Sequence, residues 1–286
     1  MTEGIILKGI GGFYYVDTPE GLIECKARGK FRKTVGKPIV GDRVQLEVQP
    51  DGTGYLMSIA PRRNSLIRPA VANLDLVVAV ASAAPPVTDP FLIDKVTAIA
   101  VHKEITPLVV INKTDADAGD ELYETYRKSG IEVLRVSART GEGIDALRER
   151  ICGKVSAFAG NSGVGKSTLV GALEPGLALR TGSISESHRK GRHTTTFSAM
   201  YPLTGGGFLI DTPGIKGFGL IDIDDHELWH YFPEMMRIGA GCRFYNCTHT
   251  HEPGCAVREA VERGEVARSR YESYLKIRDE DDKYRK

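Results

Sequence analysis

Polar and apolar positions alternate in short runs over the first 68 residues, and Gly, Pro and Asp separate the runs. The runs Gly12–Val16, Leu22–Cys25 and Arg43–Val48 predict β-strands, because alternation with a period of two places one face of a strand in a core. No stretch of this region has the spacing of an amphipathic helix. We therefore expect a small β-barrel over residues 1–68. Its charged, turn-rich sequence suits an oligonucleotide-binding (OB) fold, although five or six short strands fit other barrels too.

After Arg68 the pattern changes to apolar strands that alternate with helices. The expected strands cover residues 75–81, 108–112, 132–136, 155–159 and 208–210. The expected helices cover residues 90–102, 120–129, 144–151 and 168–173. This alternation predicts an α/β domain over residues 69–221, with a mostly parallel sheet and helices on both of its faces.

The last part of the chain, residues 222–286, predicts a small helical domain with helices over 225–231, from Glu252 or Ala256 to Glu265, and over 269–276. Three of the five cysteines lie here, in the pattern Cys242-x4-Cys247-x-His249-x5-Cys255. Three thiolates and an imidazole suit tetrahedral Zn²⁺, and because all four positions are filled we expect one structural ion. His251 as the ligand instead of His249, or buried cysteines without a metal, are the alternatives.

Composition and charge limit the function classes. The formal net charge of +1 over 286 residues argues against general coating of nucleic acid, so contact with phosphate must come from local patches. Seven basic residues and one acid lie between Lys26 and Arg43, which is either such a patch or a solvated face. The first residues lack the pattern of a secretory signal, and the apolar run 74–84 is too short to cross a bilayer. We expect a cytoplasmic protein without membrane contact.

The most informative segment follows the strand 155–159 and opens the helix after it. It fits the phosphate-binding pattern G-x-x-x-x-G-K-[ST] and consists of Gly160, Asn161, Ser162, Gly163, Val164, Gly165, Lys166 and Ser167, followed by Thr168. Glycines let backbone N–H groups surround phosphates, Lys166 should reach the β- and γ-phosphates, and the Ser167 hydroxyl should bind Mg²⁺. This loop does not distinguish ATP from GTP.

Two further segments favour a guanine nucleotide, GTP or GDP. In Asn112-Lys113-Thr114-Asp115 the carboxylate can accept hydrogen bonds from guanine N1–H and the N2 amino group, a donor pair that adenine lacks. The Lys113 stem can cover the base and Asn112 can brace the loops. Ser137 and Ala138 end the next strand and resemble the GTPase segment whose backbone N–H contacts guanine O6.

Two segments resemble nucleotide-dependent switches. Asp211-Thr-Pro-Gly214 follows an apolar strand, and its Asp211 would hold the Mg²⁺ shell while the Gly214 N–H senses the γ-phosphate. Residues 183–196 form a polar, basic candidate for the first switch, and Thr194, Thr195 or Thr196 should supply a hydroxyl to Mg²⁺. Ile215 stands where Ras-like enzymes place a water-orienting glutamine. His193 is therefore the candidate catalytic residue, with a merely structural or surface histidine as the alternative.

The base-binding segments precede the phosphate loop, so the order is circularly permuted relative to most GTPases. With Arg28-Gly-Lys, Gly41-Asp-Arg-Val, residues 68–75, Gly191-Arg-His-Thr-Thr-Thr196 and the cysteine cluster, the chain resembles the circularly permuted GTPases of the RsgA/YjeQ type nearly end to end. The resemblance implies an N-terminal OB-fold, a permuted GTPase domain and a zinc domain. It also implies GTP hydrolysis stimulated by the 30S ribosomal subunit, rRNA contact, a role in late subunit maturation, and catalysis by the residue matching His193. We expect a monomer.

Two other function classes stay open at this stage. In a metabolic P-loop kinase or ATPase the pattern Asn112–Asp115 would be a coincidence. Competition separates the two classes, because an excess of GTP but not of ATP should displace a labelled nucleotide from a GTPase. A zinc-containing nucleic-acid-binding protein that uses nucleotide only as a structural ligand would show no turnover, even with small subunits present.

Overall fold

The computed structural model describes residues 1–27, 36–67, 69–177, 199–211, 223–224 and 226–284. The chain forms two compact units. The first contains the described residues of 1–76, 151–158 and 179–213, and the second those of 77–150, 159–178 and 214–286. Among the described residues, no helix is both long enough and apolar enough to span a bilayer.

A closed five-stranded barrel dominates the first unit, which confirms the predicted N-terminal fold. Its strands are β1 (Thr2–Ile10), β2 (Phe13–Thr18), β3 (Gly21–Ala27), β4 (Arg43–Val48) and β5 (Gly54–Ile59). They follow the order β1-β2-β3-β5-β4, and β4 pairs back onto β1, which closes the barrel. The inward positions of the strands form one core that includes Ile6, Val16, Cys25, Leu46 and Leu56.

The sequence pattern alone did not identify strands β1 and β5. β1 carries three consecutive apolar residues, Ile5, Ile6 and Leu7, of which only Ile6 is buried. Because β1 pairs with both β2 and β4, its place is decided by barrel closure and not by its own alternation.

The first unit also holds shorter strands. They are β6 (Ser65–Leu66), β7 (Val71–Ala72), β11 (Val155–Ala159), β12 (Ala199–Pro202) and β13 (Phe208–Asp211). β6 and β7 pair antiparallel, β13 pairs parallel to β11 and antiparallel to β12, and β12 reaches β1 at the pair Lys8–Ala199. The predicted strands at 155–159 and 208–210 are therefore present, and they run in the same direction.

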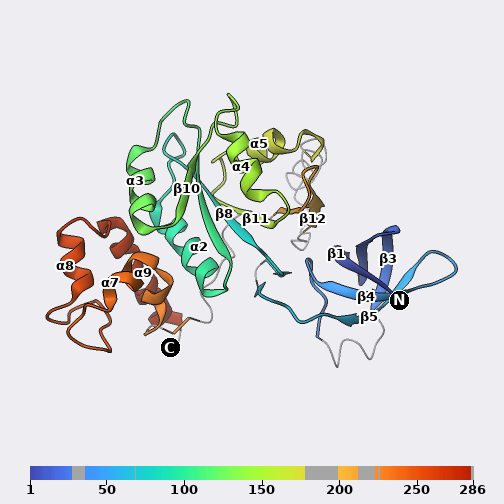
Figure 1. Ribbon diagram of the computed structural model, residues 1–286, viewed down its shortest axis with the longest axis horizontal. Coiled ribbons are helices and arrows are strands. Elements are labelled where there is room, and N and C mark those ends of the chain that lie inside the picture. The colour runs from blue at the N-terminus through green and yellow to red at the C-terminus, as the bar shows by residue number, and fades with distance from the viewer. Residues whose placement is uncertain (28–35, 68, 178–198, 212–222, 225, 285–286) are drawn as a thin grey trace. The chain divides into compact units, whose positions relative to one another are not determined.

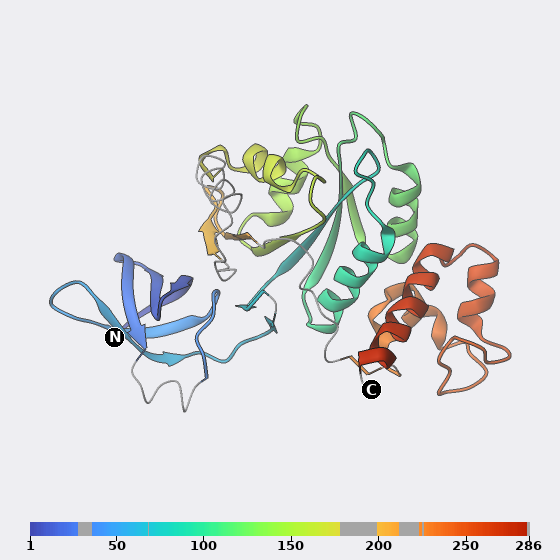
Figure 2. The same ribbon diagram turned by 180° about the vertical axis from the view of Figure 1, so that it is seen from behind.

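The second unit contains an α/β arrangement, as predicted. Its strands lie in the order β10 (Glu132–Arg135), β9 (Thr106–Asn112) and β8 (Leu76–Ser82), with β9 and β10 parallel. Four helices accompany them: α2 (Pro90–His102), α3 (Asp120–Ser129), α4 (Ile144–Ile151) and α5 (Lys166–Leu173). In Figures 1 and 2, α2 and α3 lie on one side of these strands and α4 and α5 on the other. The segments that follow β9 and β10 consequently meet at one edge of the sheet.

The C-terminal segment packs beside α2 and α3 in the same unit (Figures 1 and 2). It contains the 3₁₀ helix η2 (Leu228–Tyr231) and the helices α7 (Pro233–Gly239), α8 (Ala256–Glu262) and α9 (Arg268–Tyr284). In place of the helix expected over 225–231 the described residues hold the short η2, and α7 begins at Pro233, whose fixed φ suits a first helical turn. The sequence pattern did not identify α7, and α9 is longer than the predicted 269–276.

A buried charge cluster joins α9 to the rest of this unit. The Arg270 side chain on α9 is 1 % exposed, and its Nε and Nη2 donate to the Glu234 carboxylate of α7 at 2.6 and 3.0 Å. Its Nη1 donates to Asp94 Oδ1 on α2 at 2.8 Å, and the Tyr126 hydroxyl of α3 donates to the same oxygen at 2.8 Å. Burial alone would lower the pKa of Arg270, but the charges of Glu234 and Asp94 outweigh it and raise that pKa. The guanidinium therefore stays charged and fixes four helices together.

Candidate nucleotide and metal sites

The phosphate-loop segment curves from the end of β11 into α5. Lys166 Nζ lies inside the curve and donates to the carbonyl oxygens of Gly160 and Asn161 at 2.5 and 2.7 Å. Gly165 precedes the helix with φ of +92°, and no side chain caps the first turn of α5. The first turn of a helix directs backbone N–H groups outward along the helix axis, which is the arrangement that binds phosphate at a helix start. Val164 is buried, while Ser162, Ser167 and Thr168 are exposed.

Asn112 connects the candidate phosphate loop to both candidate base-recognition segments. Its side chain is buried, Nδ2 donates to Val164 O at 2.9 Å, and Oδ1 accepts from the Ala138 N–H at 3.1 Å. A Cβ at Gly165 would lie only 2.4 Å from Asn112 Nδ2, so the loop can approach the amide only with glycine there. One residue therefore holds together three segments that are widely separated in the sequence.

The Asp115 carboxylate is held in a defined orientation. Ser137 Oγ donates to its Oδ1, and Arg139 Nε donates to its Oδ2 at 2.7 Å. The side chain is 13 % exposed. The hydrogen bond from Ser137, followed by those from Arg139 and the charge of Arg139, lowers the pKa of Asp115. The group is therefore an ionised acceptor at neutral pH, which is the form that can receive two hydrogen bonds from guanine.

Lys113 adopts a backbone conformation that is unusual for a residue with a side chain, with φ of +66°. Its Nζ donates to Pro85 O at 2.9 Å. The next proline, Pro86, lies against the phosphate loop, because a Cβ at Gly163 would come within 2.8 Å of its Cγ. The segment after β8 therefore reaches both the base side and the phosphate side of the candidate site.

Sequence reasoning missed Arg139 and the two prolines. Arg139 comes directly after Ser137 and Ala138, and Pro85 and Pro86 follow a buried strand. Their position at strand ends of the sheet that carries Asn112 was the available signal.

Only some of the candidate switch residues belong to the described part of the chain. Asp211 ends β13, and its backbone pairs with Phe158 of β11, two residues before the phosphate loop begins. His193, Thr194, Thr195, Thr196, Gly214 and Ile215 lie outside the described residues, as do most of the basic residues between Lys26 and Arg43.

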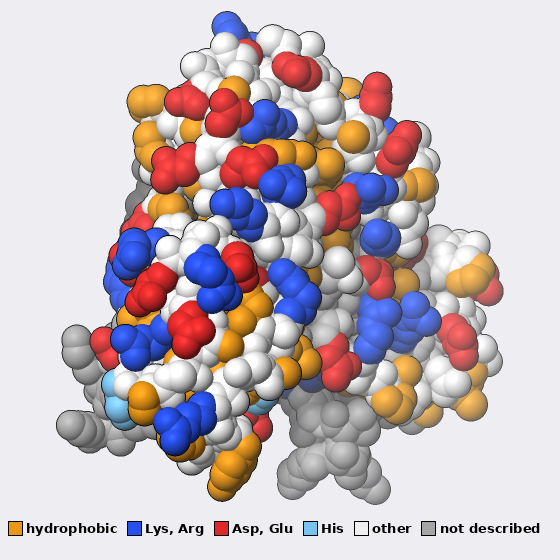
Figure 3. Space-filling model, turned by 60° about the vertical axis from the view of Figure 1, so that its left-hand side comes forward, with side chains coloured by type: hydrophobic (Ala, Val, Ile, Leu, Met, Phe, Trp, Pro, Cys, Tyr) orange, Lys and Arg blue, Asp and Glu red, His pale blue; other side chains and the backbone are white. Residues whose placement is uncertain are grey.

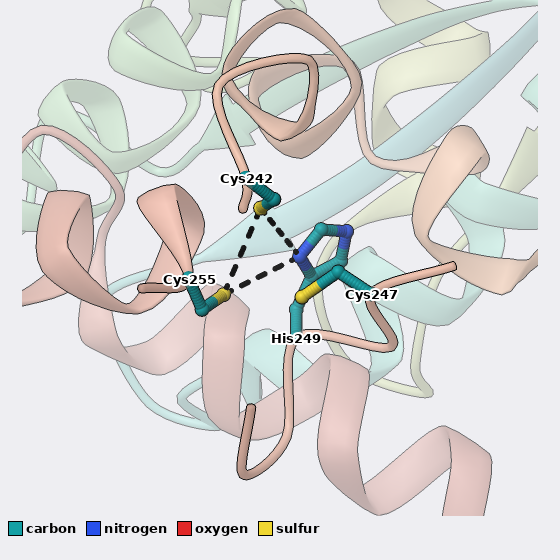
Figure 4. A group of neighbouring side chains, drawn as sticks. All are labelled: Cys242, Cys247, His249 and Cys255. Atoms are coloured by element: carbon teal, nitrogen blue, oxygen red, sulfur yellow. Dashed lines mark hydrogen bonds between the residues drawn. The ribbon is translucent and has the colours of Figure 1, made fainter. Parts of the chain in front are cut away.

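The structure brings Cys242, Cys247, His249 and Cys255 together, with their ligand atoms within 4.8 Å of one another (Figure 4). His249 Nδ1 lies 3.5 Å from Cys242 Sγ and 3.4 Å from Cys255 Sγ, and the two sulfur atoms are 4.0 Å apart. Tetrahedral bonds of about 2.3 Å to sulfur and about 2.0 Å to nitrogen give S–S separations of about 3.8 Å and N–S separations of about 3.5 Å. The cluster therefore fits zinc. His251 is exposed, and its Nδ1 contacts Thr250 Oγ1 instead.

Neighbouring side chains hold the metal-binding segment in place. The Trp229 ring meets His249 edge-on, with ring centres 4.7 Å apart. From α9, the Tyr271 and Tyr274 hydroxyls donate to the carbonyl oxygens of His249 and Thr248 at 2.7 and 2.6 Å. Burial raises the pKa of the Cys247 thiol to about 12, so the thiolate form needs a cation beside it.

We expect purified protein to contain about one zinc ion per chain, and removal of the ion by a chelator to lower the thermal midpoint, because a short polar segment has little core of its own. Cys255→Ser should lose most of the zinc. Cys152→Ser is the matched control, since Cys152 is exposed and its Sγ contacts Gly205 O at 2.8 Å. A zinc content below about half an equivalent in the parent protein would contradict the assignment.

The phosphate loop, the buried asparagine and the oriented carboxylate define a P-loop protein of the GTPase class in which the base-recognition segments come first. Comparisons with known proteins agree. Residues 59–221 match the family model described as RsgA GTPase, and residues 3–56 match the RsgA N-terminal domain. The chain belongs to the RsgA GTPase family and is a GTP-hydrolysing enzyme.

Relatives and solved structures match over nearly the whole chain. The "small ribosomal subunit biogenesis GTPase RsgA" of Bacteroides fragilis is 44 % identical, with 99 % of each chain covered. Its counterpart in Caldanaerobacter subterraneus is also 44 % identical, over 96 % of this chain and 94 % of that one. The crystal structure of YjeQ from Thermotoga maritima matches with a TM-score of 0.82, 39 % identity and 98 % of both chains covered. YloQ, a circularly permuted GTPase, matches with a TM-score of 0.80, 33 % identity and coverage of 100 % and 96 %. The permuted order predicted from the motifs is thus confirmed.

Proposed function

We propose that this GTPase acts in late maturation of the small ribosomal subunit, that its hydrolysis of GTP is stimulated by the 30S particle, and that it contacts rRNA in a nucleotide-dependent manner. The names of its relatives from Bacteroides fragilis and Caldanaerobacter subterraneus support the small ribosomal subunit as the partner. Within this proposal it acts as a cytoplasmic monomer, with the barrel of residues 1–68, the GTPase domain of 69–221 and the zinc domain of 222–286 as its three parts.

The base of the nucleotide is assigned to the edge formed by the segments after β9 and β10. Asp115 accepts from guanine N1–H and N2, the Lys113 stem covers one face of the ring, and Ser137 orients the carboxylate from the side. The contact with guanine O6 is assigned to the backbone N–H of Ala138, which in this structure donates to Asn112 Oδ1 at 3.1 Å.

The phosphates are assigned to the curve from Gly160 to Thr168, where backbone N–H groups and Lys166 neutralise negative charge. Mg²⁺ is assigned to the Ser167 hydroxyl, to Asp211 and to Thr194 or Thr195. The ion would supply charge compensation for the β- and γ-phosphates. Gly214 is assigned to sensing the γ-phosphate, and His193 to positioning the attacking water, because Ile215 has no polar group for that task.

The observation that carries the proposal is the double hydrogen bond of Asn112, with Val164 of the phosphate loop on one side and Ala138 on the other. It supports a single nucleotide that spans both segments in spite of their reversed order. An ATP-dependent enzyme would have no use for the oriented carboxylate of Asp115, so an excess of GTP but not of ATP should displace a labelled nucleotide.

Measurements of steady-state GTP hydrolysis test whether the 30S subunit is the partner. We expect purified 30S subunits to raise the turnover of GTP by about 10²-fold or more, because ordering a single charge-stabilising or water-positioning group is worth that much in a transition state. Purified 50S subunits are the control for a general effect of ribosomal RNA. Lys166→Ala, which removes the phosphate-binding ammonium, should abolish turnover in both cases and so exclude a contaminating enzyme. Equal turnover with and without 30S subunits would contradict the proposal.

A further inference from the structure

Four residues separate the first two cysteines of the metal cluster, and all four are exposed: Arg243, Phe244, Tyr245 and Asn246. We call the segment from Cys242 to Cys247 the cysteine turn. The Tyr245 side chain is 100 % exposed and Phe244 is 40 % exposed. In Figure 3 the C-terminal part of the chain comes forward, and hydrophobic side chains lie next to Lys or Arg at the lower end of that face. Two aromatic rings exposed to water beside the cysteine cluster do not serve the core of this region.

The cysteine turn is a fixed support. The Cys247 N–H donates to Phe244 O at 3.2 Å, and the Arg243 N–H donates to Gly254 O at 3.0 Å. Both ends of the turn belong to the cluster that fits zinc. Aromatic side chains on a rigid support lose little conformational entropy on binding, since each has only two rotatable bonds.

The charge of this surface suits a polyanion. No Asp or Glu occurs from Cys242 to His251, and the Arg243 guanidinium lies 5.4 Å from the centre of the Phe244 ring. Glu252 is the nearest acid along the chain, and its two carboxylate oxygens accept from the backbone N–H groups of Thr248 and Thr250. That carboxylate is therefore held by the loop, and no ion pair between it and Arg243 is described.

We propose that the cysteine turn is a docking surface for unpaired bases of RNA, with Tyr245 as the stacking platform, Phe244 beside it and Arg243 facing the phosphates. The inference deepens the proposed function, since rRNA is the RNA such a protein would meet. Exposed aromatic rings beside a guanidinium are the groups that stack on splayed bases. A protein partner is less well matched, because a stable protein interface covers about 800 Å² on each side around an apolar centre, whereas Asn246 and Thr248 flank these two rings.

Affinity measurements on the full-length protein test the platform. The probes are purified 30S subunits and a fluorescein-labelled single-stranded oligouridine of about 12 nucleotides. Tyr245→Ala should weaken binding to both by about 5- to 150-fold, the range for loss of one stacked base. Tyr245→Phe keeps the ring and should bind like the parent, whereas Tyr245→Leu keeps apolar bulk without a planar face and should behave like the alanine variant. Zinc content and thermal midpoint should not change, because the side chain is exposed. Met236→Ala is the control, as Met236 is also exposed, at 57 %.

The outcomes separate the two proposals. Parent-like affinity of Tyr245→Ala for both probes, or of Tyr245→Leu, would overturn the stacking role and leave the proposed function intact. A parent protein that does not bind 30S subunits would overturn the proposed function, and the oligouridine arm would still decide the stacking role. Benzoylphenylalanine in place of Tyr245 should form photo-crosslinks to rRNA in the 30S complex, and crosslinks to ribosomal protein alone would count against RNA as the partner.

Discussion

Asp115→Asn should weaken GTP binding by at least about 100-fold. In the proposed site the substitution removes two charge-assisted hydrogen bonds to guanine, each worth about 1.5 to 3 kcal/mol. An Asn side chain whose NH₂ group faces guanine N1–H would set one donor against another. The same amide matches xanthine, which carries a carbonyl oxygen at position 2. The variant should therefore bind and hydrolyse XTP, as measured by competition against a labelled nucleotide and by phosphate release.

Asp117→Asn is the matched control, because Asp117 lies in the same segment and its Oδ1 accepts only from the Gly119 N–H, at 2.9 Å, among the hydrogen bonds described for it. That variant should bind GTP like the parent protein. If Asp115→Asn kept the parent affinity for GTP and gained none for XTP, the base would have to bind elsewhere. The assignment of guanine to this edge of the sheet would then be wrong.

Arg270→Met is expected to destabilise the second unit by about 3 to 5 kcal/mol, the cost of leaving buried carboxylates without their partner. Both Asp94 and Glu234 are almost completely buried and depend on this guanidinium. Urea unfolding followed by the fluorescence of Trp229 measures the loss, because Trp229 is the only tryptophan of the chain and packs on His249 near α9.

Arg263→Met provides the comparison. Arg263 pairs with Glu265 at 2.8 Å, but its side chain is 54 % exposed, so the change should cost little stability. Adding Asp94→Asn and Glu234→Gln to Arg270→Met removes the uncompensated charges and should recover part of the lost stability. If Arg270→Met lowered the free energy of unfolding no more than Arg263→Met does, the buried charge cluster would not hold the helices together.

Local motifs made much of this protein predictable. The phosphate loop is a contiguous segment whose chemistry comes from its own backbone and Lys166, so its pattern can be read wherever it occurs. The four residues of the metal cluster lie within fourteen positions, and a short segment can bring them together without help from a distant part of the chain. The strands and helices of the α/β region were predictable too, because their apolar runs are long and lie between clear turns.

The sequence pattern did not predict those elements whose structure depends on packing against other strands and helices. Barrel closure defines β1, as its own apolar residues do not alternate, and α7 is too short to show a period of its own. α9 has the charged sequence of a solvated helix, and its Arg270 is nonetheless among the most deeply buried side chains described. No helical pattern predicts that, because an arginine is buried only where carboxylates from other helices compensate it.

The sequence by itself predicted the chemistry of the candidate nucleotide and metal sites, namely which groups would bind phosphate, which would recognise guanine and which would hold a soft cation. Only the tertiary structure decided how those groups meet. Asn112 reaches Val164 across 52 positions, Arg139 joins Asp115, and Arg270 finds Asp94 across 176 positions. The reason is physical: a backbone loop or a short cluster of ligands carries its chemistry locally, whereas contacts between distant side chains exist only after strands and helices have packed.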